Sequence, residues 1–287
     1  MNKVFRFLAM YTICFAFATL ASAQTLTKLD YPGATATTLN GGPNPQGTYI
    51  GSYTDTAGLT HGFLLYKGVF SSFDPPGSVL TVPNWISPQG TIVGQYVDSK
   101  NVSHGFILNA GNYTTVDVPG AAGTVLTGLS PSGEMSGFSC ADTPCLVGPF
   151  HSFIVSKKGA FEGFDPPGAV SSTASTVNPS GVVVGAFTDS SGVLHGYLLE
   201  HEKFTTIDYP GSTLTFVGAN NPEGDMVGLY NDSAGAGHAF LLSNGVFTSF
   251  DFPGAVFTDA AGINPSGTIV GIYFDAAGVE HGFIRTP

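Results

Sequence analysis

A four-part phrase recurs six times along this chain. Each copy holds an Asp-x-Pro-Gly turn, a Pro-x-Gly turn, a Gly-x-aromatic-x-Asp segment and a His-Gly-Phe unit, or close variants of these. Successive copies are 43 to 48 residues apart, which is the length of a four-stranded propeller blade. The repeat therefore predicts one all-β domain built as a six-bladed β-propeller, with four antiparallel strands per blade. The Asp residues that open the copies are Asp30, Asp74, Asp117, Asp165, Asp208 and Asp251.

The two ends of the chain complete each other. The last copy stops after its His-Gly-Phe unit, and the missing segment is found near the N-terminus, where residues 26–33 match residues 247–254. We therefore expect the N-terminal strand to complete the last blade and close the ring, a need that an open solenoid does not have. The expected blades are 34–77, 78–120, 121–168, 169–211, 212–254, and 255–287 together with 24–33.

The first 23 residues have the pattern of a secretory signal peptide. Lys3 and Arg6 precede an apolar run over 7–20, and Ala21-Ser22-Ala23 forms a small-residue cleavage site. A retained membrane anchor is the alternative, but the run is shorter than the roughly 20 residues that span a bilayer. We expect residues 24–287 to form a single secreted or periplasmic domain of a bacterial protein, with no membrane span after cleavage.

The charge balance argues against one class of partner. The chain has 20 Asp and Glu against nine Lys and Arg, and phosphate backbones are bound by clustered Lys and Arg. We therefore expect no nucleic-acid partner and treat the protein as a monomer.

Two cysteines follow the signal peptide, and both lie in the one irregular copy. Gly137 and His151 are 14 positions apart, where the other copies have ten. A disulfide between Cys140 and Cys145 fits an exported protein. A metal site with Asp142 and His151 is the alternative.

The recurring units carry a resemblance to a known family. His-Gly-Phe, His238-Ala239-Phe240 and His151-Ser152-Phe153 resemble the HAF family of extracellular repeats, and His195-Gly196-Tyr197 departs slightly. The resemblance covers nearly all of the chain after residue 23. It implies an exported bacterial β-propeller-like protein and brings no catalytic residues.

The repeated acids and histidines should gather at one end of the ring. Up-and-down strand order places the Asp-x-Pro-Gly turns, a second set of Asp residues and the histidines together, making that face electronegative. We expect a structural role, with each His bonded to an Asp. The alternative is calcium, held by the second set, because Ca²⁺ prefers carboxylate and carbonyl oxygens. The histidines are His61, His104, His151, His195, His238 and His281, and the calcium candidates are Asp55, Asp98, Asp189, Asp232 and Asp275.

Departures from the repeat are better candidates for a ligand site than the repeated residues. Aligned on the proline of the Pro-x-Gly turn, one column holds hydroxyls that we expect around the axis: Thr38, Thr81, Thr124, Ser172, Thr215 and Thr258. In the next column (Leu39, Val82, Val125, Thr173, Phe216, Asp259) Asp259 alone is charged. Trp85 is the only tryptophan, in a column of small residues. Asp259 and Trp85 are therefore the predicted ligand-binding residues, with solvated acid and core packing as their plainer interpretations.

These features favour a non-catalytic binding or scaffold module for an extracellular protein, polysaccharide or cell-surface component. The alternative is a glycan-directed hydrolase or lyase that uses Asp259 or another unrepeated acid: Glu134, Glu162 or Asp225. No carboxylate pair with diagnostic spacing is evident, and the sequence calls for no cofactor other than the calcium considered above.

Overall fold

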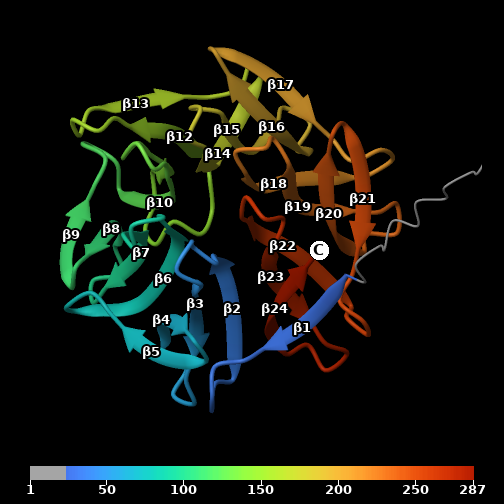
Figure 1. Ribbon diagram of the computed structural model, residues 1–287. Coiled ribbons are helices and arrows are strands. Elements are labelled where there is room, and N and C mark those ends of the chain that lie inside the picture. The colour runs from blue at the N-terminus through green and yellow to red at the C-terminus, as the bar shows by residue number, and fades with distance from the viewer. Residues whose placement is uncertain (1–23) are drawn as a thin grey trace, which may run out of the picture.

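The computed structural model describes residues 24–287, and every regular element in that range is a β-strand. The strands form sheets set around a central axis (Figure 1). Within the same range no helix is long and apolar enough to cross a membrane. The predicted signal peptide, residues 1–23, lies outside the described residues.

Four sheets have four antiparallel strands each, in the order of a propeller blade. Three of them take their strands consecutively from the chain, and the fourth combines its two ends. They are β10 (Gly123–Leu129), β11 (Met135–Cys140), β12 (Phe150–Val155) and β13 (Phe161–Phe164); β14 (Ala169–Val177), β15 (Val183–Asp189), β16 (Leu194–Glu200) and β17 (Lys203–Ile207); β18 (Leu214–Asn220), β19 (Met226–Asn231), β20 (Gly237–Ser243) and β21 (Val246–Phe250); and β22 (Phe257–Ile263), β23 (Ile269–Phe274), β24 (Glu280–Thr286) and β1 (Thr25–Leu29).

The first two copies of the repeat share one eight-stranded sheet. The prediction of six separate four-stranded blades is therefore wrong, because the propeller has four such blades and this larger sheet. The two copies meet through a single parallel pairing, Thr60 with Leu80. The strands are β2 (Ala36–Gly41), β3 (Thr48–Thr54), β4 (Thr60–Tyr66), β5 (Val69–Phe73), β6 (Ser78–Ile86), β7 (Ile92–Asp98), β8 (Ser103–Asn109) and β9 (Asn112–Val116).

A proline accompanies the early start of β6. Where the turn reads Asp-x-Pro-Gly with a non-proline second residue, the N–H of that residue donates to the first hydroxyl of the innermost strand, as Tyr209 does to Thr215 at 3.0 Å. Pro75 has no N–H to donate. β6 begins at Ser78 and is nine residues long, and its first residues include Leu80. β14 follows the equivalent Pro166-Pro167 turn and is also nine residues long.

The chain ends pair with each other. β1 runs antiparallel to β24, with Thr25 opposite Thr286 and Leu29 opposite Gly282. The match between residues 26–33 and 247–254 predicted this closure correctly.

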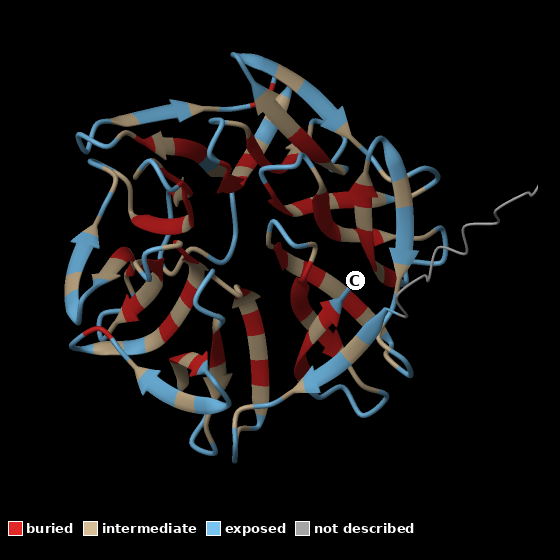
Figure 2. Cartoon of the chain, in the orientation of Figure 1, coloured by how far each residue is buried: buried red, intermediate tan, exposed pale blue. Residues whose placement is uncertain are grey.

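The core lies between neighbouring sheets. Figure 2 shows the outermost strands (β1, β5, β9, β13, β17 and β21) mainly exposed and the strands inside them mainly buried or intermediate. The aromatic ring of each His-Gly-Phe unit is fully or almost fully buried, as at Phe106. Phe106 lies over Gly94 of β7, where an added Cβ would be 2.8 Å from its Cε1 atom. The repeated glycine is thus needed for the repeated phenylalanine to pack, and burying such a ring is worth about 1.5–3 kcal/mol.

Candidate functional site

Every repeated histidine is hydrogen-bonded to the Asp of the turn that follows it. The His61 Nδ1 atom lies 2.7 Å from Asp74, and the last histidine, His281, reaches back to Asp30 of the first turn at 2.9 Å. The other four pairs have the same contact at 2.9–3.0 Å: His104–Asp117, His151–Asp165, His195–Asp208 and His238–Asp251. The sequence predicted these His–Asp contacts, and they join the third strand of each unit to the turn beyond the fourth.

A second aspartate approaches most of these histidines from the other side. Asp55 accepts hydrogen bonds from the Ala57 and Leu59 amides at 2.8 and 2.9 Å, and its second carboxylate oxygen lies 3.5 Å from His61 Nε2. Asp98, Asp189, Asp232 and Asp275 repeat this arrangement. Each of the five histidines therefore lies between two carboxylates.

These contacts shift the pKa values of the histidines and aspartates that make them. The hydrogen bond that His61 donates to Asp74 raises the pKa of His61, and the bond to Asp251 does the same for His238. Backbone amides, led by that of Leu59, lower the pKa of Asp55, and the Ser191 hydroxyl leads the groups that lower the pKa of Asp189 to about 2. The doubled contacts are ion pairs when the histidines are protonated.

The same contacts engage the carboxylates that the sequence offered for calcium. Each of the five loop aspartates is held by loop amides on one oxygen and faces a histidine with the other. Over residues 24–287, no three His, Cys, Asp or Glu side chains are grouped so that they could hold a metal ion. Calcium at these loops stays a prediction that this geometry does not favour.

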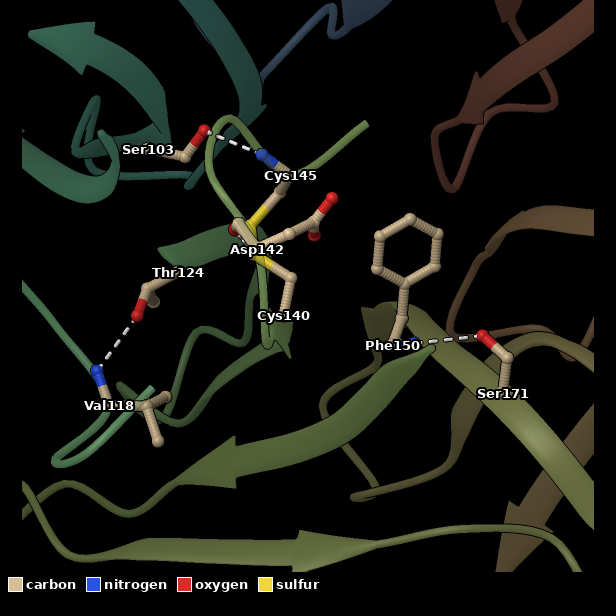
Figure 3. Close-up of a disulfide and its surroundings, with 8 residues drawn as sticks. All are labelled: Ser103, Val118, Thr124, Cys140, Asp142, Cys145, Phe150 and Ser171. Atoms are coloured by element: carbon tan, nitrogen blue, oxygen red, sulfur yellow. Dashed lines mark hydrogen bonds between the residues drawn. A yellow bond between two sulfur atoms is a disulfide. The ribbon is translucent and has the colours of Figure 1, made fainter. Parts of the chain in front are cut away.

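The third copy departs from this pattern at the predicted disulfide. Cys140 and Cys145 are bonded, with their Cα atoms 5.7 Å apart, and the Cys145 amide donates to Ser103 Oγ at 3.2 Å (Figure 3). The loop therefore contacts β8 of the preceding copy. His151 keeps its turn partner Asp165, but its side chain is 59% exposed, against 25% for His61.

The predicted column of hydroxyls does not ring the axis. Five of the six side chains are buried, and three accept a hydrogen bond from the Asp-x-Pro-Gly turn before them, as Thr124 does from the Val118 amide at 2.8 Å (Figure 3). The first copy contributes Thr37 in place of the predicted Thr38, because Thr37 pairs with Tyr53 as Thr81 pairs with Tyr96. The first copy has one extra residue, next to Pro43, so alignment on the turn proline shifted its column by one position.

At the other end of the ring, all six turn prolines converge on one cavity. We call it the proline mouth; its volume is about 120 Å³ and most of its lining is apolar. Asparagines of three turns also line it and bond onward, with the Asn178, Asn221 and Asn264 amide nitrogens each 3.4 Å from a carbonyl of the next copy. The prolines are Pro45, Pro88, Pro131, Pro179, Pro222 and Pro265.

Trp85 lines the proline mouth from the axis. Its ring packs against the apolar cluster of the second and third copies, which includes Leu126, and also against the cluster of the fifth and sixth, which includes Ala219. The equivalent positions across the ring are Ala219 and Gly262, whose small side chains leave room for an indole. Trp85 therefore reaches across the axis, and the core-packing and ligand-binding interpretations both keep support.

A second cavity lies on the other side of Trp85. We call it the inner chamber; its volume is about 150 Å³, and Trp85 lines both it and the proline mouth. Each innermost strand has a β-bulge at this level, an extra residue that the partner strand does not match. The bulged residues all line the chamber: Asn40, Asn84, Thr127, Ser175, Gly218 and Ala261.

Asp259 projects into the inner chamber two residues before the bulge of β22. Burial raises its pKa to about 6. Its Oδ1 atom and the Ser175 Oγ atom are the two buried side-chain oxygens without a hydrogen-bond partner among the described residues. The bulges that surround Asp259 were missed by the sequence analysis, although they fall four residues before the turn proline in copies two to six.

The other unrepeated acids lie elsewhere. Glu134 and Asp225 belong to the turns after β10 and β18, and Glu162 is exposed on the outer strand β13. Asp259 is the single carboxylate among the residues that line the chamber. The structure thus does not bring together the carboxylate pair that a glycosidase of the usual kind needs.

Comparison with known proteins defines the class. The fold is that of a β-propeller, and three solved structures with this fold illustrate the likeness. AofleA from Arthrobotrys oligospora aligns with a TM-score of 0.58 at 14% identity, over 91% of this chain and 86% of its own. Virginiamycin B lyase from Staphylococcus aureus gives 0.52 at 11%, over 92% and 99%. The Aleuria aurantia lectin in complex with α-methyl-L-fucoside gives 0.54 at 10%, over 86% and 90%.

At this level of identity the likeness concerns the fold alone. No protein-family model matches the sequence, and neither does any curated protein. The resemblance to the HAF family therefore stays a prediction.

Proposed function

We propose that this protein is an exported, non-catalytic binding module that takes the end of a polysaccharide chain into the proline mouth. One observation carries the proposal: six turn prolines, one from each copy, surround a cavity that the only tryptophan also lines. Small-ligand sites are typically concave and apolar with a few fixed polar groups. The proline mouth has that character.

The size and stiffness of the cavity favour the end of a chain. A volume of about 120 Å³ has room for one small ring and not for an extended chain. The asparagine contacts between successive copies hold its rim in place, so little ordering is needed on binding. An aromatic side chain such as Trp85 can provide a large contact area for the apolar face of a sugar.

Two further observations support the general role. The Aleuria aurantia lectin, which shares the fold, binds α-methyl-L-fucoside. The Cys140–Cys145 disulfide is typical of proteins from oxidising compartments, which agrees with the predicted signal peptide and with export.

The test is a titration of intrinsic fluorescence with a panel of polysaccharides and their terminal monosaccharides. Trp85 is the sole tryptophan, so a saturable shift reports one known position. Calorimetry should then show binding weakened by at least about tenfold in Trp85→Phe, the scale of a buried aromatic anchor. Tyr66→Phe, on an exposed ring of β4, should bind as the parent does.

The proposal fails if a folded sample shows neither a fluorescence shift nor a calorimetric signal with any glycan. In that case Trp85 would be a packing residue, and the search would turn to protein partners.

A further inference from the structure

The inner chamber differs from the proline mouth in the polar side chains of the bulged residues that line it. Three bulged side chains of the first half of the ring bond to the innermost strand of the next copy. Asn40 Nδ2 donates to the Pro83 carbonyl at 2.9 Å, Asn84 Nδ2 to that of Leu126 at 2.8 Å, and Thr127 Oγ1 to that of Ala174 at 2.7 Å. One N–H of each asparagine and the threonine proton are thus engaged by these carbonyls, and within residues 24–287 no hydrogen bond engages the asparagine side-chain oxygens, which are acceptors.

This series of bonds stops at Ser175. Its Oγ has no partner, although the residue is only 7% exposed. The next two bulged residues, Gly218 and Ala261, have no polar side chain, so they leave space on that side of the chamber. Asp259 is placed there, with its Oδ1 atom also buried and unpartnered.

No cationic side chain is among the residues that line the chamber. A buried carboxylate without a countercharge is costly, and here it faces further oxygens and a single free hydroxyl. A ligand that brings hydrogen-bond donors and one positive charge would satisfy this set.

We propose that the inner chamber is a binding site for a compact primary ammonium group, held by the Asp259 carboxylate and the neighbouring bulge oxygens. Three N–H donors of such a group match the carboxylate, Ser175 and an asparagine oxygen. Trp85 and Phe216 both line the chamber and offer aromatic faces, which attract organic cations. A divalent ion fits less well, because calcium sites use several carboxylates and this one has a single negative charge.

The charge of the protein favours entry of a cation. The end of the ring that carries the His–Asp pairs holds most of the acidic side chains of a chain with net charge −11, and clefts of one sign concentrate ligands of the other. Asp259 and Phe216 lie toward that end of the chamber, at the starts of their strands, whereas Trp85 lies toward the proline mouth. Trp85 lines both cavities, but Asp259 is not among the residues that line the proline mouth, so the ammonium site does not rest on the proposed glycan site.

Titration of the protein with methylammonium chloride tests the proposal, with sodium chloride holding ionic strength constant. Trp85 lines the chamber, so its fluorescence reports occupancy. Calorimetry measures the binding directly. We expect a saturable response that Asp259→Asn weakens by at least about tenfold, since the ammonium loses a buried charged partner. Glu162→Gln removes the same charge from the exposed strand β13 and should leave the response unchanged.

A neutral ligand of matched size separates charge from fit. Ethanolamine should bind, whereas ethylene glycol at the same concentration should not. If Asp259→Asn does not fold, as judged by circular dichroism, Ser175→Ala provides the second variant, and we expect it to bind methylammonium several-fold more weakly.

Three results would overturn the ammonium site: no response to either amine, an equal response to ethylene glycol, or potassium and calcium chloride binding as well as methylammonium. Glycan binding at the proline mouth would be unaffected by any of them, so the two proposals fail separately.

Discussion

At one end of the ring, six copies of the repeat build nearly the same His–Asp contact. Around the axis near the other end, each copy contributes a bulged residue and the residue after it, and no two copies have the same pair. His61, His195 and His238 each lie between two aspartates in equivalent geometry. By contrast, the Trp85 column is otherwise small, and Asp259 is the only acid in its own column. The repeated residues hold the ring together and surround both cavities, whereas the departures, Trp85 and Asp259, give the cavities their distinctive side chains.

The largest effect should come from breaking a repeated packing contact. Phe106→Ala removes a fully buried ring over Gly94 and should lower the free energy of unfolding by about 3–5 kcal/mol. Urea denaturation followed by circular dichroism measures it. Tyr66→Ala, with an exposed ring, should cost less than about 1 kcal/mol. Equal losses would mean that the repeated phenylalanine is not what stabilises the ring.

Replacing Asp259, a departure from the repeat, should raise the free energy of unfolding at neutral pH. The folded pKa of Asp259, about 6, is above the ordinary 3.8, so the folded state binds the proton more tightly than the unfolded state does. Stability of the parent should therefore fall as pH rises from about 4 to about 6 and then level off. Asp259→Asn should be close to neutral at pH 4 and stabilising by about 2–3 kcal/mol at pH 7.

Urea denaturation at pH 4, 5, 6 and 7 checks the Asp259 prediction. Because parent and variant share the same histidines, their titration cancels in the difference. Glu162→Gln should show a difference that is flat with pH. A difference for Asp259→Asn that is also flat would show that this carboxyl group does not titrate abnormally.

The smallest effect compares two histidines of the repeated set. His61→Gln disturbs contacts with two aspartates and should cost about 1–2 kcal/mol, whereas His151→Gln, exposed and with one aspartate, should cost less than about 0.5 kcal/mol. The pKa of His61 is raised, so its ion-pair contribution is complete below pH 6.5 and is lost as pH rises through the raised value. Thermal melts at pH 6 and pH 9 should show the larger His61 effect at pH 6, and equal losses for both variants would remove the distinction between doubled and single contacts.

Much of the fold could be predicted because the repeated residues make the same contacts in each copy. The Asp-x-Pro-Gly and Pro-x-Gly turns and the His–Asp contacts follow from chemistry that is copied along the chain. The pairing of β1 with β24 follows from the match of residues 26–33 to residues 247–254. The sharing of one sheet by the first two copies could not be predicted from counting repeats. It rests on the one Thr60–Leu80 pairing at the early start of β6, and β14, which follows the equivalent Pro166-Pro167 turn and is equally long, makes no such pairing.

The site was predicted only as two separate residues. The sequence marked Trp85 and Asp259 as exceptions, but alignment on the turn proline gave no hint of the bulges, and it displaced the first copy by one residue. A bulge is a register feature of two paired strands, and a single strand does not reveal it. Asn40, Asn84 and Ser175 therefore appeared as unremarkable polar residues until the pairing placed them in one ring.

The pairing of β1 with β24 also determines how the ring responds to tension. Thr25 and Thr286 stand opposite each other, so a pull on both of them acts on the same end of the two strands. The pairs would then separate one after another, as in unzipping, and would not resist together in shear. A load applied between these two ends would open the ring at this junction, whereas attachment through one end only would leave the junction unstressed.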